Sequence, residues 1–245
     1  MIFTVEGISD KGLKRWHNED HLLLDDNLFT DDYFFKEFNA NTQRAVFAVA
    51  DGMGGHKAGE VASLEVLKSL FNFSESLPEK AYYDFIRQKF NNWIIDAHMD
   101  LKRMSDENSE YRGMGTTLTG LLYYNGAFFW FHAGDSRLYI FHKGKLRQLT
   151  TDHTLAWMTN DPTIPSNYIA NSIGGGKKPF LDMEKLDDPI EPSDMLLLCS
   201  DGLSDMLSKK ELEDLLINPD LQKIMEKAYE KGARDNISLL LVKID

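Results

Sequence analysis

The dipeptide Asn125-Gly126 separates two long apolar segments, residues 116–124 and 127–133. Asn-Gly is a strong signal for a two-residue β-hairpin loop, because both residues tolerate positive φ. A second turn at residues 143–144 is also flanked by strand-like segments. The middle of the chain is therefore predicted to form antiparallel strands joined by tight turns.

The rest of the chain shows strand patterns at both ends and helical patterns between them. The segment from 25 to 41 is acidic and aromatic, and we interpret it as a surface excursion between strands. Further strands are predicted at 2–8, 44–50, 180–185, 194–199 and 237–244. The spacing of apolar residues predicts a helix over 60–71. Capping-box patterns at 76–79 and 208–211 predict the starts of two more helices, and a fourth helix is predicted to end near Gly232.

This order of elements predicts an α+β layered fold, because strands at the ends and centre must bury their apolar faces against grouped helices. Residues 1–245 contain no internal repeat and no linker rich in Pro, Gly or Ser. A single domain is the simplest organisation for a chain of this length. Residues 154–178 are predicted to be irregular, with three consecutive glycines at 174–176.

Charge and cysteine content exclude several classes of function. The 27 Lys+Arg against 39 Asp+Glu give a net charge of −12, which disfavours nucleic acids and anionic membranes as partners. The single cysteine, Cys199, ends an apolar segment and is predicted to be a buried thiol. No stretch approaches the roughly 20 apolar residues of a membrane span, and the N-terminal residues lack a signal-peptide pattern. We expect a cytoplasmic, reducing location.

Four aspartates, Asp51, Asp135, Asp201 and Asp235, lie next to apolar strand segments and close to glycine or asparagine. Strands place such carboxylates at defined positions, and hard cations such as Mg²⁺ and Mn²⁺ prefer oxygen ligands. A single Asp-Gly is more often a turn than a metal ligand. The pattern therefore suggests a metal site without naming a reaction.

Six short motifs make the interpretation more specific, because they occur together in one order. They are Arg15-Trp16-His17-Asn18-Glu19-Asp20, Asp51-Gly52-Met53-Gly54-Gly55-His56, Gly115-Thr116-Thr117, Gly134-Asp135-Ser136-Arg137, Ser200-Asp201-Gly202-Leu203 and Arg234-Asp235-Asn236-Ile237. This order closely resembles the bacterial form of the PPM family of protein phosphatases, the PP2C-like enzymes. The resemblance covers nearly the whole chain.

The resemblance implies a four-layer α-β-β-α fold, in which helices flank a central antiparallel β-sandwich with a binuclear Mg²⁺/Mn²⁺ centre at one end. By similarity, Asp51 would bridge both metals, and the Gly52 carbonyl with Glu19 would serve one of them. Asp201 and Asp235 would hold the other metal. Asp135 and Asp205 match a third, weaker metal position of this family.

The same resemblance assigns roles to residues around the metals. Arg15 matches the arginine that grips the substrate phosphate, and Asp20 would act in the surrounding water network. His56 is a candidate for protonating the leaving alkoxide. In eukaryotic relatives a histidine directly follows the Asp-Gly pair, whereas here three residues intervene, so substrate contact or loop structure is an equal alternative for His56. His17, His21 and His153 receive no functional role.

The segment from 154 to 171 corresponds to the flap that helps to choose substrates in this family. It is shorter than in most bacterial relatives, and Asn171 stands where an arginine is common. These departures bear on substrate preference more than on chemistry.

The resulting hypothesis is a Mg²⁺/Mn²⁺-dependent phosphatase of phosphoserine and phosphothreonine proteins, in which a metal-activated water attacks phosphorus without a phosphoenzyme. We expect it to be a monomer that opposes a Ser/Thr kinase. Two alternatives remain open: a catalytically silent member that binds phosphoproteins, and a hydrolase of another phosphate ester.

Overall fold

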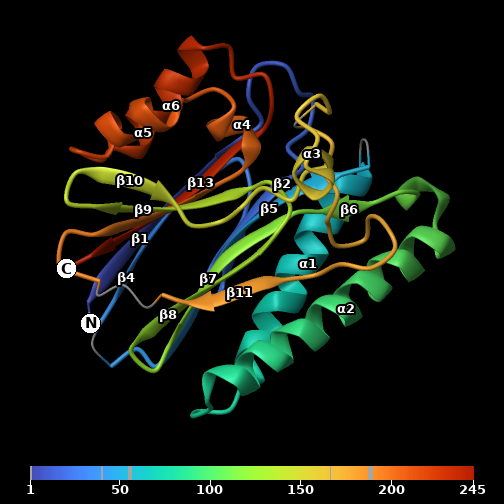
Figure 1. Cartoon of the computed structure of the whole chain (residues 1–245), viewed down its shortest axis with the longest axis horizontal. Helices are drawn as coiled ribbons and strands as arrows, with labels where there is room; N and C mark the ends of the chain where they lie inside the picture. Colours follow the sequence, from blue (N-terminus) through green and yellow to red (C-terminus); the bar gives the residue numbers. More distant parts are fainter. Residues whose placement is uncertain (1, 40, 55–56, 166, 187–189) are drawn as a thin grey trace.

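Two antiparallel β-sheets lie face to face at the centre of the molecule (Figure 1). The computed structural model describes residues 2–39, 41–54, 57–165, 167–186 and 190–245. The first sheet contains, in spatial order, β10 (Lys145–Gln148), β9 (Arg137–His142), β12 (Met195–Cys199), β13 (Ile237–Ile244), β1 (Phe3–Asp10) and β4 (Tyr33–Phe38). The second contains β11 (Asp182–Lys185), β8 (Ala127–Ala133), β7 (Leu118–Tyr124), β5 (Arg44–Met53), β2 (Asp20–Leu24) and β3 (Asn27–Phe29), and β6 (Gly115–Thr116) pairs with β5.

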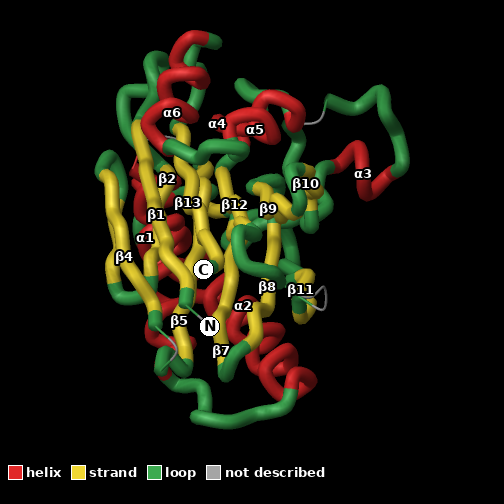
Figure 2. Tube along the Cα trace, turned by 90° about the vertical axis from the view of Figure 1, so that its left-hand side faces the viewer, coloured by secondary structure: helices red, strands yellow, loops and turns green. Residues whose placement is uncertain are grey.

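Helices cover the outer face of each sheet, which confirms the predicted α-β-β-α layers. α1 (Lys57–Glu75) and α2 (Tyr83–Glu107) pack on the second sheet, and the short η1 (Ser109–Tyr111) follows α2. α4 (Asp201–Ser204), α5 (Lys209–Leu215) and α6 (Leu221–Glu230) pack on the first sheet. The segment that carries α3 (Leu155–Thr159) stands out from the body of the molecule (Figure 2). None of the helices in the described ranges has the length and apolar character needed to cross a membrane.

Strand β5 shows how one sequence serves two cores. Its even-numbered residues Val46, Ala48 and Ala50 pack toward α1 and α2, whereas Phe47 and Val49 pack between the sheets. Successive side chains of a strand point to opposite faces, so a strand buried on both faces must be continuously apolar. This burial holds the end of β5, and Asp51 with it, in a fixed place.

Strands β1 and β13 pair antiparallel along their whole length, from Phe3↔Ile244 to Asp10↔Ile237. The pairing brings the loop after β1 against the residues that precede β13. The N-terminal Arg15–Asp20 motif thereby meets the C-terminal Asp235-Asn236 pair, although they are more than 200 residues apart in the chain.

The local signals for turns and for one helix start are confirmed. Asn125 and Gly126 have φ of 49° and 86°, the positive values of the expected hairpin turn. Ser208 and Glu211 form both hydrogen bonds of the predicted capping box at the start of α5. Cys199 is fully buried and free.

Two predictions about the first half of the chain are wrong. The capping-box pattern at 76–79 does not start a helix: α1 runs on to Glu75, the Ser76 hydroxyl donates to the Phe73 carbonyl at 2.6 Å, and α2 begins only at Tyr83. The excursion at 25–41 contains β3 and β4. Because β4 is an edge strand whose residues are mostly exposed or half-buried, it lacks the apolar run of the central strands.

Gly120 provides a test of packing between the second sheet and its helices. A Cβ at this position would lie 2.1 Å from the ring of Phe131. We expect Gly120→Ala to lower the free energy of unfolding by about 1–3 kcal/mol through overpacking, as measured by denaturant titration. If the ring is the obstacle, Gly120→Ala with Phe131→Leu will be less destabilised than the sum of the two single variants, and strictly additive costs would contradict this explanation.

Candidate active site

Six of the residues predicted for the site line one cleft of about 520 Å³ at one end of the β-sandwich. Within the described residues, the cleft also contains the side chains of Lys14, Trp16 and His17, and Ile169 of the segment around α3. The six predicted residues are Arg15, Glu19, Asp51, Gly52, Asp201 and Asp235.

The aspartates of this cleft lie at or next to the ends of strands. Asp51 lies in β5 and is paired in register with Asp20 of β2. Asp201 follows the end of β12, and Asp235 precedes the start of β13. Because β12 and β13 are antiparallel neighbours, the last residue of β12 and the first residue of β13 lie close together at the same end of the sheet.

Close backbone approaches hold the loops of the cleft together. A Cβ at Gly202 would lie 1.9 Å from the Asn236 carbonyl oxygen, and one at Gly52 would lie 2.1 Å from that of Gly59. The Gly52 N–H donates to the Glu19 carbonyl at 3.1 Å. Glycine is therefore required next to both aspartates because no side chain fits, which explains the two Asp-Gly pairs.

The carboxylates of the cleft repel one another. Burial, followed by repulsion from Asp20, Asp201, Asp135 and Asp235, raises the pKa of Asp51 well above its usual value. Burial raises the pKa of Asp20 to about 7 and that of Asp201 to about 6. Negative charges this close together in a poorly hydrated site destabilise the fold unless the carboxyls bind protons or a cation compensates them.

Two buried carboxylate oxygens, Oδ1 of Asp20 and Oδ1 of Asp135, have no hydrogen-bond partner in the described part of the chain. The other oxygen of Asp20 accepts from the Ser200 hydroxyl at 2.7 Å. Burial, with repulsion from Asp201, raises the pKa of Asp135 to about 7. Asp205 also interacts with Asp201 and Asp135, yet neither Asp135 nor Asp205 lines the cleft itself.

The arrangement fits a hydrated hard cation better than a protein cage. Among the described residues, no three His, Cys, Asp or Glu side chains converge closely enough to bind a metal by themselves. Mg²⁺ and its relatives keep several waters and need only one or two direct carboxylates. Donors that are all oxygen, orphaned buried carboxylate oxygens and mutual repulsion together match that requirement.

Arg15 reaches over the carboxylates from the loop after β1. Its guanidinium pairs with Asp235 at 2.6 Å, and the two side chains are 55% and 37% exposed. The hydrogen bond with Asp235 is the largest cause that raises the pKa of Arg15. A planar cation at the mouth of the cleft suits a bidentate phosphate ligand.

Asn236 organises this loop, a role that the sequence analysis did not assign. Its amide group donates to the carbonyls of Lys11 and His17, each at 2.9 Å. Its carbonyl oxygen accepts from the Glu19 N–H at 2.9 Å. One side chain thus holds the loop on both sides of Arg15. The one feature of the sequence that could have indicated this role is the position of Asn236 directly after Asp235 in the last of the six motifs.

His153, to which the sequence analysis gave no role, clamps the turn before Asp135. Its backbone N–H donates to the Gly134 carbonyl at 2.7 Å, and its ring Nδ1 accepts from the Gly134 backbone N–H at 3.2 Å. Asn171, where relatives often have arginine, also donates to this Nδ1 at 2.9 Å. The base of the predicted flap is therefore joined to the Asp135 turn. His56 lies outside the described residues, so its predicted role is untested.

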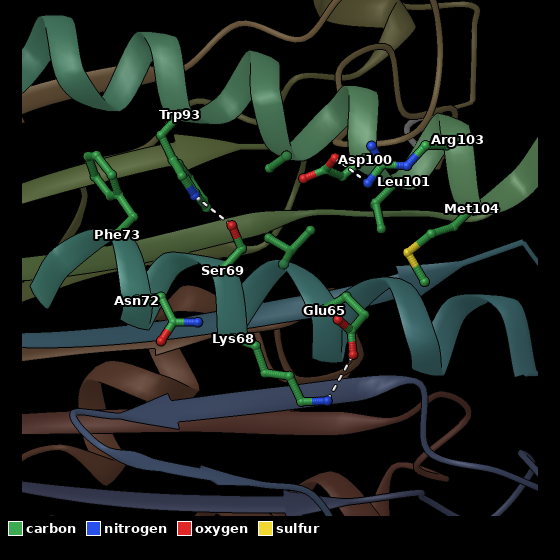
Figure 3. Close-up of a pocket in the computed structure, with 12 residues that line it drawn as sticks. Glu65, Lys68, Ser69, Asn72, Phe73, Trp93, Asp100, Leu101, Arg103 and Met104 are labelled. Carbon is green, nitrogen blue, oxygen red and sulfur yellow. Dashed lines mark hydrogen bonds and ion pairs between the residues drawn. The ribbon is translucent and has the colours of Figure 1, made fainter. Parts of the chain in front are cut away.

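A second groove lies between α1 and α2 (Figure 3), and none of the residues that line the acidic cleft lines it. Its charged side chains pair with neighbours on their own helix, Lys68 with Glu65 and Arg103 with Asp100. The indole N–H of Trp93 donates to the Ser69 hydroxyl at 2.9 Å. The charged groups of this groove are paired along their own helices, and this makes it a weaker candidate for chemistry than the acidic cleft.

Comparison with known proteins decides the family. The model of a family described as protein phosphatase 2C matches residues 23–241. The chain belongs to the protein phosphatase 2C family. This confirms the resemblance drawn from the six motifs, and it makes the protein a protein phosphatase.

Bacterial members of the protein phosphatase 2C family are similar over the whole chain. The serine/threonine phosphatase stp of Listeria monocytogenes is 29% identical, over 97% of this chain and 94% of that protein. The solved structure of the S. agalactiae serine/threonine phosphatase has a TM-score of 0.82 at 25% identity, and covers 99% of this chain and 100% of that one. The catalytic domain of PstP in complex with two manganese ions has a TM-score of 0.76 at 28% identity, with both chains fully covered.

Because the carboxylates of the cleft repel one another, removing one of them should stabilise the metal-free protein and weaken metal binding. In metal-free protein, Asp51→Asn should raise the Tm by about 2–4 °C, equivalent to about 1 kcal/mol, because a carboxyl whose pKa is raised by its neighbours lowers the stability of the fold at neutral pH. Added Mn²⁺ should raise the Tm of the unsubstituted protein and leave that of the variant unchanged, as measured by calorimetry. A metal-free variant less stable than the parent would contradict the inferred repulsion.

Proposed function

We propose that this protein hydrolyses phosphoserine and phosphothreonine in protein substrates, with a water activated at a binuclear Mg²⁺/Mn²⁺ centre. The observation that carries the proposal is the set of half-buried, mutually repelling carboxylates that line one cleft with Arg15. The names of the similar bacterial serine/threonine phosphatases and the manganese-bound PstP domain support it.

The residues of the cleft divide into two metal-binding groups. Asp51 would serve both cations, with Glu19 and the Gly52 carbonyl on one side and Asp201 and Asp235 on the other. Bound cations of this kind lower the pKa of water and offset the negative charge of the phosphoryl oxygens. Asp135 and Asp205, which interact with Asp201 from outside the cleft, would hold a third and weaker ion.

Three further side chains would bind substrate or handle protons. Arg15 would donate two parallel hydrogen bonds to phosphate oxygens from the mouth of the cleft, where Asp235 already orients its guanidinium. Asp20, fixed by the Ser200 hydroxyl, would accept hydrogen bonds from water through its unpartnered Oδ1. His56 remains the candidate proton donor to the leaving serine or threonine oxygen.

Other parts of the proposal concern the protein as a whole. Residues 1–245 would form one catalytic domain, with the segment at 154–178 as the flap that contributes to substrate choice. The enzyme would act as a cytoplasmic monomer and reverse the action of a Ser/Thr kinase.

Substitution of one metal ligand tests the chemistry. With Mn²⁺ or Mg²⁺ present, the unsubstituted protein should hydrolyse a phosphothreonine peptide and p-nitrophenyl phosphate, and chelation should abolish both activities. Asp201→Asn should lower kcat/KM by about 100-fold or more, because a charged ligand is lost. Asp84→Asn, a change of the same kind on the exposed face of α2, is the control. If neither substrate is hydrolysed with any added metal, the protein is not a phosphatase of this type.

Substitution of Arg15 tests phosphate binding separately. We expect Arg15→Ala to raise KM for the phosphopeptide about tenfold with a smaller change in kcat, because a charge-assisted contact to phosphate is lost. Lys14→Ala removes the same charge from the same cleft and should have a smaller effect, since lysine lacks the planar fork. Reduced Mn²⁺ affinity with an unchanged KM would show that Arg15 supports the metals instead.

A further inference from the structure

Trp16 is 90% exposed and lines the same cleft as Arg15 and the carboxylates. An indole left in water keeps a large apolar surface that gains free energy when another apolar group covers it. The family resemblance gives this residue no role. Its place beside the predicted phosphate-binding arginine makes it a candidate for contact with substrate.

The loop that carries Trp16 is held firmly on both sides. Before it, the Leu13 N–H donates to the Ala233 carbonyl at 2.8 Å. After it, Asn236 donates to the His17 carbonyl at 2.9 Å, and the buried Asn18 donates to the Ser9 hydroxyl at 2.9 Å. A loop whose backbone is already fixed loses little backbone entropy when one of its side chains binds a ligand.

Two more apolar side chains, Met53 and Ile169, line the same cleft. Ile169 belongs to the flap, and a β-bridge with Thr154 holds its backbone. The neighbouring Ala170 N–H donates to the His153 carbonyl at 2.8 Å. The acidic cleft is therefore also lined by apolar groups from three separate segments, which are the loop after β1, the end of β5 and the flap.

We propose that Trp16 binds an apolar side chain next to the phosphorylated residue, so that substrates carry an aliphatic or aromatic residue one or two positions from phosphoserine or phosphothreonine. This inference rests on the proposed phosphatase function. Arg15 and Trp16 are neighbours in the chain and line one cleft. An extended peptide advances about 3.3–3.6 Å per residue, so the residues next to a phosphate bound at Arg15 are the ones within reach of Trp16. The negative charge of the cleft and of the whole chain disfavours acidic flanking residues.

A second copy of the chain is a less suitable partner for Trp16. A large aromatic side chain buries at most about 250 Å², whereas a stable interface buries roughly 800 Å² on each partner. The apolar area of one indole is enough to cover one or two peptide side chains but not to hold a protein interface.

The test compares two phosphothreonine peptides that differ only in the residues flanking phosphothreonine, leucine in one and serine in the other. The proteins are the unsubstituted enzyme, Trp16→Ala, Trp16→Phe and Tyr82→Ala, all loaded with Mn²⁺. Tyr82 is also 90% exposed but precedes α2 and does not line the cleft, so its variant is the matched control. Light scattering reports the mass of each protein.

We expect the unsubstituted enzyme to prefer the leucine peptide about tenfold in kcat/KM, mainly through KM. Trp16→Ala should remove most of that preference, Trp16→Phe should keep part of it, and Tyr82→Ala should keep all of it. Equal losses on both peptides, or no loss, would overturn the inference, as would a dimer that dissociates in Trp16→Ala. Failure of the unsubstituted enzyme to hydrolyse p-nitrophenyl phosphate would instead overturn the proposed function, and the inference with it.

Discussion

The antiparallel pairing of the first strand with the last determines where the acidic cleft forms. Because β1 and β13 run side by side over their full length, the loop that leaves β1 meets the residues that enter β13. Asn236 then holds that loop through three hydrogen bonds, and Arg15 pairs with Asp235. The contacts between the Arg15–Asp20 motif and the Asp235-Asn236 pair depend on the register of β1 against β13, because a shift of one residue in that pairing would turn the side chains of one strand to the opposite face.

Electrostatic repulsion between the aspartates of the cleft lowers the stability of the fold. Asp20 and Asp51 lie opposite each other in register, and Asp201 and Asp235 approach from the other sheet. Their burial raises the pKa of each carboxyl for which a shift is resolved, so the fold holds charge that is costly without a cation. The apolar cores on both sides of the sheets resist the rearrangement that would separate these groups. The surrounding structure thus offsets the repulsion between the carboxylates of the functional site.

Local signals predicted structure where a few neighbouring residues decide the backbone. The hairpin at Asn125-Gly126 and the capping box at Ser208 are confirmed for this reason. The pattern at 76–79 failed because the Ser76 hydroxyl bonds back to Phe73 in the last turn of α1, and the packing of α1 on β5 extends that helix to Glu75. Edge strand β4 was missed because its pairing with β1 depends on tertiary contacts that its exposed residues do not reveal.

The sequence by itself determined the family and the layered fold, because six ordered motifs and continuous apolar strands are local properties of the chain. It also named the four carboxylates that line the acidic cleft, Glu19, Asp51, Asp201 and Asp235. Only the tertiary structure placed Asp20 and Asp135 as buried groups with unpartnered oxygens, Asn236 and His153 as the residues that hold the loops, and Trp16 at the mouth of the cleft. The physical reason is that burial and hydrogen bonding arise between segments up to some 220 residues apart, whose approach is determined by strand register and packing.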